Sequence, residues 1–150
     1  RPDIAWRHAS SGRNVVWLMN GTTRTTGVFT TPDTVADTNW LIAGTGDFNS
    51  DGQQDLIWRQ ALSGNVVVWL MNGTVRTAGT FINPPSLADP NWQMAAVGDL
   101  SQDGQPDILW RHAVSARTVL WEMDGLSRSY GLYTTPDAPR PLNWNLVGPR

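Results

Sequence analysis

Two acidic stretches hold the residues of this chain that are best suited to bind a metal ion. Residues 46–55 read Gly-Asp-Phe-Asn-Ser-Asp-Gly-Gln-Gln-Asp, and residues 98–107 read Gly-Asp-Leu-Ser-Gln-Asp-Gly-Gln-Pro-Asp. Ca²⁺ takes about six to eight oxygen ligands, and a tight turn at glycine can bring such ligands together. The pattern therefore predicts calcium, with side-chain or backbone oxygens from Asp47, Asn49, Asp51, Gln53 and Asp55, and from Asp99, Ser101, Asp103, Gln105 and Asp107.

The same loops have a purely structural alternative. Asp and Asn in a glycine-containing turn commonly accept hydrogen bonds from their own backbone, as in Asx-turns. Serine is also a weaker calcium ligand than asparagine, so the second loop favours the metal less than the first. An EF-hand is excluded, because the bidentate glutamate that ends such a loop is missing here.

Tryptophan and arginine form the second set of candidate binding residues. Aromatic rings stack on the apolar faces of sugars, while arginine donates directed hydrogen bonds, and repeated weak sites gain by avidity. This mixture predicts a carbohydrate-binding, lectin-like protein whose partners are glycans. The candidates are Trp6, Arg7, Trp40, Trp58, Arg59, Trp92, Trp110, Arg111 and Trp144. The alternative is that the tryptophans fill the core between sheets, above all Trp17, Trp69 and Trp121.

An enzyme is not expected. The chain has no Gly-x-Ser-x-Gly elbow, and Glu122 is its only glutamate, so paired catalytic carboxylates would have to come from the acidic loops. His8 and His112 lie where the middle part of the chain has Gln60, which indicates surface or hydrogen-bonded histidines.

The candidate residues recur because the sequence is an internal repeat of 52 residues. All nine tryptophans obey this step: Trp6, Trp58 and Trp110; Trp17, Trp69 and Trp121; Trp40, Trp92 and Trp144. The repeats run over residues 3–54, 55–106 and 107–150 and form a single domain over residues 1–150. Three repeats are also compatible with a trefoil or a closed threefold barrel.

Each repeat reads as four short β-strands. In the middle copy, β-forming runs cover residues 55–61, 65–71, 75–82 and 91–97. Asn72-Gly73 predicts a type I′ hairpin, and Pro84-Pro85 is expected to break the chain after the third strand. Four antiparallel strands in about 50 residues, repeated, predict an all-β fold made of β-propeller blades.

The loop at residues 46–55, the following Leu-Ile-Trp-Arg and the later Val-Trp-Leu-Met-Asn-Gly resemble the FG-GAP/VCBS repeats of bacterial secreted proteins. These repeats are similar to the calcium-bearing blades of integrin α-chain propellers and of several propeller lectins. The resemblance implies an extracellular protein, and it assigns the calcium ligands to the ten loop positions given above. It also implies that the strands of Trp40 and Trp92 are innermost in their blades and that residues 75–82 are outermost.

In this register the third blade is split between the two ends of the sequence. The residues that would match positions 47–52 are missing there, which leaves Asp3 as an orphaned last ligand. We therefore expect two chains to pair head to tail into a six-bladed ring, each lending its Trp144 strand to the other. The alternatives are a fragment of a longer seven-bladed chain and an engineered assembly protein without a ligand of its own.

Composition excludes several other partners. The formal net charge is -2, which gives no electrostatic attraction to nucleic acid. There is no cysteine, so the chain has neither disulfides nor cysteine-ligated zinc. No apolar run approaches the roughly 20 residues of a membrane span, so membrane insertion is not expected.

Overall fold

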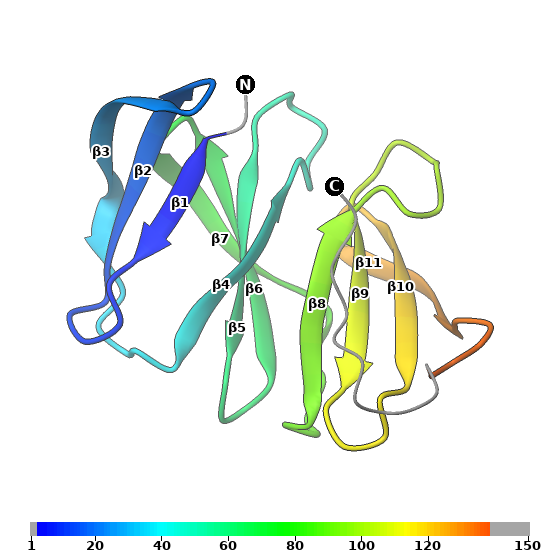
Figure 1. The fold of residues 1–150 in the computed structure, drawn as a ribbon. Coiled ribbons are helices and arrows are strands. Elements are labelled where there is room, and N and C mark those ends of the chain that lie inside the picture. The colour runs from blue at the N-terminus through cyan, green and yellow to red at the C-terminus, as the bar shows by residue number, and fades with distance from the viewer. Residues whose placement is uncertain (1–2, 139–150) are drawn as a thin grey trace.

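The computed structural model describes residues 3–138, and this part of the chain is all-β, as predicted (Figure 1). It contains eleven strands and no helix, and thus no helix long and apolar enough to cross a membrane. The strands are β1 (Ile4–Arg7), β2 (Arg13–Asn20), β3 (Thr23–Thr34), β4 (Trp40–Gly46), β5 (Asp55–Gln60), β6 (Asn65–Asn72), β7 (Val75–Ser86), β8 (Trp92–Gly98), β9 (Asp107–His112), β10 (Thr118–Asp124) and β11 (Ser127–Tyr133).

The strands form three antiparallel units. The first unit is β1–β3, the second is β4–β7 and the third is β8–β11, and within each unit consecutive strands pair. The second unit lies between the other two (Figure 1). Neighbouring units touch where β3 and β11 each meet β7 in a single parallel pair, and β4 also lies against β8. The described strands do not close into a ring.

Strand β7 is longer than predicted. Pro84 and Pro85 were expected to end it, but it continues to Ser86, which pairs with Asn65 of β6. Proline lacks the backbone N–H and is tolerated on edge strands. Since the far side of β7 pairs with β3 and β11 at only one residue each, the prolines remove little from the ladder.

The hairpin at Asn72-Gly73 is where the sequence placed it, but its turn type is different. Asn72 is still paired with Val75, so the two loop residues are Gly73 and Thr74. Gly73 has a φ of 60°, whereas neither Asn72 nor Thr74 has a positive φ. A positive φ at the first loop residue alone is the type II′ pattern rather than the predicted type I′.

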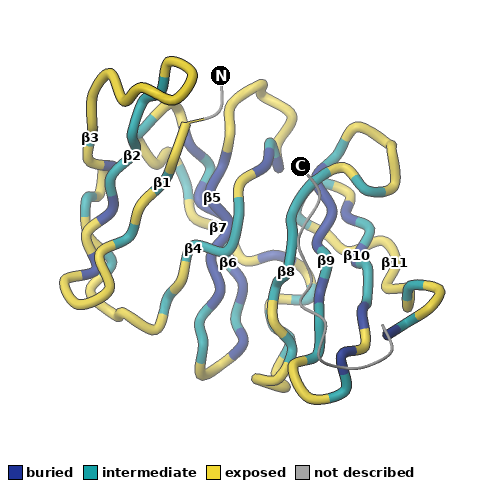
Figure 2. Tube along the Cα trace, in the orientation of Figure 1, coloured by how far each residue is buried: buried dark blue, intermediate teal, exposed yellow. Residues whose placement is uncertain are grey.

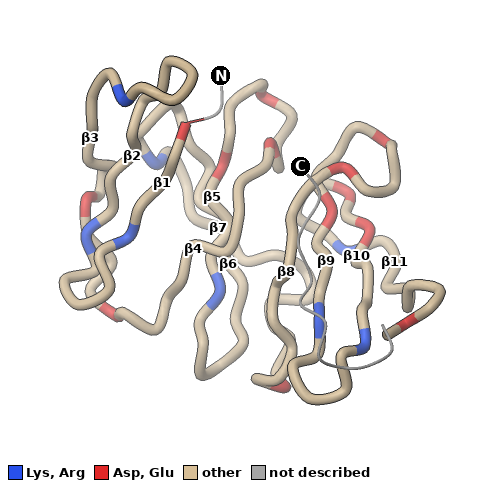
Figure 3. Tube along the Cα trace, viewed as in Figure 1, with Lys and Arg blue, Asp and Glu red and all other residues tan. Residues whose placement is uncertain are grey.

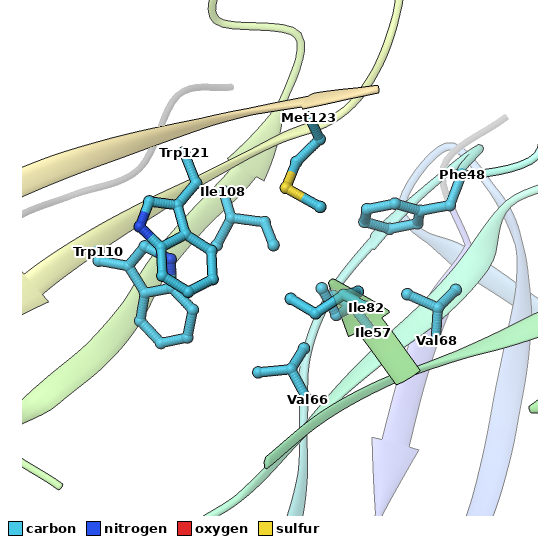
Figure 4. Close-up of a cluster of buried hydrophobic side chains, with 9 residues drawn as sticks. All are labelled: Phe48, Ile57, Val66, Val68, Ile82, Ile108, Trp110, Trp121 and Met123. Carbon is cyan, nitrogen blue, oxygen red and sulfur yellow. The ribbon is translucent and has the colours of Figure 1, made fainter. Parts of the chain in front are cut away.

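Each unit has two apolar faces, and the core lies between units rather than within one. One face carries two tryptophans, and we call it the tryptophan face; the opposite one is the aliphatic face. In the third unit the tryptophan face includes Trp110 and Trp121, and Figure 4 shows it packed on the aliphatic face of the second unit. The aliphatic side of this contact consists of Ile57, Val66, Val68 and Ile82, joined by Phe48.

The seam between the first and second units repeats this packing more loosely. The tryptophan face of the second unit consists of Leu56, Trp58, Trp69 and Met71, and it packs against Ala5 and Val35. Burial is therefore deepest in β5, β6 and β9, while β1 and β3 are largely exposed (Figure 2).

Gly64 and Gly73 both have positive φ, yet we expect them to differ in tolerance to alanine. A Cβ at Gly64 would lie 2.2 Å from the carbonyl oxygen of Leu87, whereas one at Gly73 would meet nothing within 4 Å. Gly73→Ala should lower the free energy of unfolding by about 1 kcal/mol, the cost of a left-handed alanine. Gly64→Ala should lower it at least about twice as much, because the backbone must also move. Urea unfolding of both variants measures this, and equal losses would contradict the predicted clash.

Candidate functional site

The first acidic loop, residues 47–55, joins β4 to β5 and is held by bonds from its own backbone. The carboxylate of Asp47 accepts from the N–H of Asp51 at 3.1 Å and from the N–H of Gly52 at 2.8 Å. Asp51 accepts from the N–H of Gln53 at 2.8 Å and from the side-chain amide of Asn49 at 2.9 Å. Gly52 has a φ of 82°, as a tight turn of this kind needs.

The second acidic loop, residues 99–107, joins β8 to β9 in the same conformation. Asp99 accepts from the N–H of Asp103 at 3.0 Å and from the N–H of Gly104 at 3.1 Å. Asp103 accepts from the N–H of Gln105 at 2.9 Å. Both loops lie at the same end of the sheets, where acidic positions gather (Figure 3). The alternative of Asx-type bonding therefore describes how these loops are folded.

The last aspartate of each loop has a different task. Asp55 is completely buried, and its two oxygens accept from the N–H of Phe48 at 2.9 Å and the N–H of Met71 at 2.8 Å. Asp107, also completely buried, does the same with Leu100 at 2.9 Å and Met123 at 3.1 Å. Each of the two carboxylates thus fastens an acidic loop to the middle of its sheet.

Asp3, which the sequence left as an orphaned ligand, takes part in the same structural scheme. Its carboxylate accepts from the N–H of Met19 at 2.8 Å, which matches the bonds of Asp55 to Met71 and of Asp107 to Met123. The spacing is sixteen residues in every case. The recurrence of this aspartate is therefore explained by its hydrogen bond to the backbone of the next hairpin strand, which is β2, β6 or β10, and it does not require a metal.

Burial raises the pKa of Asp55, and the nearby charges of Asp51 and Asp47 add to the rise. The hydrogen bonds from Met71 and Phe48 oppose it, because they stabilise the ionised carboxylate. Ionisation of Asp55 is therefore disfavoured by burial, and the hydrogen bonds from the two backbone N–H groups partly offset this effect.

In the described conformation the carboxylate oxygens of the acidic loops do not converge on a single point. Among residues 3–138, no three His, Asp or Glu side chains converge in a way that could hold a metal ion. Asp55 points inward to backbone N–H groups, whereas Asn49 and Asp51 lie exposed at the turn. Carboxylates retain lone pairs after accepting one hydrogen bond, so the exposed turn still offers the hard oxygens that Ca²⁺ prefers.

The tryptophans expected to bind sugar divide into two groups. Trp58 and Trp110 are only 1% and 0% exposed, and each stacks on a second buried tryptophan, Trp69 or Trp121, at 4.7 and 5.0 Å between ring centroids. Rings without an accessible face cannot stack on a ligand, so the burial of Trp58 and Trp110 favours the alternative in which they fill the core. Trp40 and Trp92 are half-buried, and Trp6 is exposed. Trp144 lies outside the described residues.

The arginines beside these tryptophans hold the units together. Arg7 donates to the carbonyls of Val35 and Asp37, both at 3.0 Å, and Arg59 donates to the carbonyl of Leu87 at 3.3 Å. Both guanidinium groups also lie over a tryptophan of the next unit: Arg7 over Trp58 at 5.2 Å, and Arg59 over Trp110 at 5.4 Å. Arg59 is buried, which favours a structural role for this arginine over ligand binding.

Sequence reasoning missed a pocket of about 620 Å³ between the first and second units. Its apolar lining includes Ala5, Val16 and Met71, which precede Ile57, Val68 and Met123 by one repeat. At the next seam Phe48 fills the equivalent space (Figure 4). None of the described residues that line the pocket between the first and second units is aromatic.

Residues 47–110 match the FG-GAP-like repeat family. This segment is therefore similar to an FG-GAP-like repeat. It begins at the first acidic loop, includes the second and ends in β9, so the match covers the features on which the resemblance was based. A search of curated proteins gives no match, and neither does a search of solved structures.

Asp55 and its exposed equivalent Asp3 give a matched test of the hydrogen bond between this aspartate and the backbone. Asp55→Asn turns one acceptor oxygen into an amide that faces a backbone N–H inside the protein, at a cost of about 1–3 kcal/mol. Asp3→Asn alters the exposed equivalent and should cost less than about 0.5 kcal/mol. Chemical denaturation at a pH well above the pKa of Asp55 measures both, and losses of the same size would contradict the structural role.

Proposed function

We propose that the chain is a non-enzymatic binding or scaffold module of the β-propeller type, in which the three units are blades. The observation that carries this proposal is the radial repetition of one packing scheme: the tryptophan face of each later unit packs on the aliphatic face of the unit before it. The FG-GAP-like match supports it. Strands β4 and β8 would be innermost, and β3, β7 and β11 outermost.

A scaffold role is favoured over a lectin role by where the aromatic residues lie. Most of the ring area of Trp58 and Trp110 is buried between units. The arginines that lie over these two rings, Arg7 and Arg59, donate hydrogen bonds to backbone carbonyls. The exposed acidic loops, in contrast, carry side-chain oxygens that can still accept hydrogen bonds or bind a cation. In this proposal the blades supply rigidity and the loops supply contacts to partners.

We further propose that the two acidic loops bind calcium. Asp47, Asn49 and Asp51 would contribute side-chain oxygens in the first loop, and Gln53 a backbone carbonyl. Asp99, Ser101, Asp103 and Gln105 would do so in the second. A bound cation would neutralise the clustered carboxylates, whose mutual repulsion contributes to the raised pKa of Asp55.

Calcium should therefore raise the thermal stability of the protein. A ligand that binds only the folded state at a concentration of about 100 times its Kd adds about 2.7 kcal/mol. We expect a higher Tm with CaCl2 than with EGTA by differential scanning fluorimetry. Asp51→Ala should remove the part of this shift that comes from the first loop, and Asp51→Ala combined with Asp103→Ala should abolish most of it. Asp33→Ala, which removes an exposed ion pair with Arg13, should preserve the shift. A Tm that ignores calcium in all of these proteins would overturn the calcium sites.

Carbohydrate binding is a second candidate, supported by one remaining pocket. It has a volume of about 270 Å³, and it is lined in part by Trp40, Thr34 and Arg76. Trp40 is the half-buried ring in this group, so one of its faces is the best available platform for a sugar.

Glycan-array binding with and without chelator distinguishes the two candidates. If the pocket binds sugar, Trp40→Ala should remove the signal, because the stacking platform is lost. Trp92→Ala, in the equivalent position one repeat later, is the matched control and should retain binding, since the described pocket does not include Trp92. A silent array with folded protein leaves the scaffold role and rejects the lectin role.

A further inference from the structure

The first unit presents a tryptophan face that nothing among residues 3–138 covers. Trp6 is 46% exposed and Ile4 is 41% exposed. One repeat later, Trp58 and Leu56 are 1% and 5% exposed. Two repeats later, Trp110 and Ile108 are completely buried. The same face is therefore exposed in the first unit and covered in the other two (Figure 2).

The exposed face already has the geometry of the buried ones. Trp6 and Trp17 lie with their ring centroids 4.7 Å apart at 47°, and the buried pair of Trp58 and Trp69 has values of 4.7 Å and 46°. Binding would thus require no rearrangement of the two rings. A preorganised aromatic surface loses little conformational entropy when it is covered.

What covers the buried tryptophan faces is the same in both seams. The aliphatic face of the preceding unit supplies apolar side chains, such as Ile57 and Val68 against Trp110 (Figure 4). The preceding unit also supplies an arginine: Arg7 lies over Trp58, and Arg59 lies over Trp110.

The third unit carries a further copy of this covering face. Leu109, Leu120 and Leu100 occupy the repeat positions of Ile57, Val68 and Phe48. These leucines are half-buried, whereas their counterparts in the second unit are 0–1% exposed. Arg111 occupies the repeat position of Arg7 and Arg59. Three substitutions depart from the pattern, since Thr118, Glu122 and Thr134 stand where the second unit has Val66, Leu70 and Ile82.

We propose that the tryptophan face of the first unit, Ile4, Trp6, Trp17 and Met19, binds the aliphatic face of the third unit of a second copy of this chain. The guanidinium of Arg111 in the second copy lies over the indole of Trp6, as Arg7 and Arg59 do within one chain. Arg7 combines its position over a tryptophan with hydrogen bonds to backbone carbonyls, so an arginine at this repeat position can make both kinds of contact at once. The proposal rests on the blade architecture proposed above.

The two faces lie on units at opposite flanks of the chain (Figure 1). A single contact between two copies would leave one face of each kind uncovered. A head-to-tail pair with two equal contacts covers both, and closed symmetric dimers are the commonest oligomers. The geometry therefore favours a closed pair over an open filament.

Sedimentation velocity over a range of concentrations tests the proposal. The wild-type chain should sediment with twice the mass of one chain. Trp6→Arg places a second cation against Arg111 and should raise the dimer Kd at least about tenfold, as expected for a central tryptophan. The double variant Trp6→Arg with Arg111→Glu should recover part of the affinity, because the new charges attract. Tyr130→Ala, which removes another exposed ring, should leave the dimer intact.

Acrylamide quenching of tryptophan fluorescence provides a readout on the unmodified protein, and it should weaken as the chain dimerises. Circular dichroism checks that each variant is folded, which is expected since Trp6 is largely outside the core. A folded wild-type monomer at all concentrations would overturn the second-copy contact while leaving the blade scaffold in place. A dimer that tolerates Trp6→Arg would place the contact elsewhere and would also reject the proposal.

Discussion

The packing of a tryptophan pair on the aliphatic face of the neighbouring unit is the interaction on which this structure depends. A four-stranded antiparallel sheet with two apolar faces cannot bury both by itself. In the second unit, Trp58 and Trp69 face one neighbour while Ile57 and Val68 face the other. Stability is therefore a property of seams, as in other repeat proteins, where each repeat contacts only the next.

The acidic loops are connected to those seams by a small number of polar bonds. The carboxylate of Asp55 holds the backbone of Phe48 at one oxygen and that of Met71 at the other, and both of these residues pack in a seam. Loop conformation and sheet packing are thus coupled through one buried charge. Any ligand of the loop acts on a segment whose position is already fixed by the core.

Much of the fold could be predicted from the sequence, because strand periodicity and the 52-residue step are local signals. The hairpin at Gly73 was placed correctly for the same reason. Its turn type was not, since it depends on which residue ends the ladder. The length of β7 was missed because the tolerance of Pro84 depends on the edge position of the strand. The burial of Trp58 is evident only from the structure, because residue type alone does not report whether a neighbouring sheet covers a ring.

The pocket between the first and second units, whose lining holds no aromatic ring, makes the two seams of one chain unequal in packing. The seam between the second and third units is filled by an aromatic ring, so pulling those sheets apart means exposing a dense apolar interior to water. The other seam contains a pocket of about 620 Å³, so fewer dispersion contacts cross it. Separating the first sheet from the second should consequently expose less apolar surface than separating the second sheet from the third.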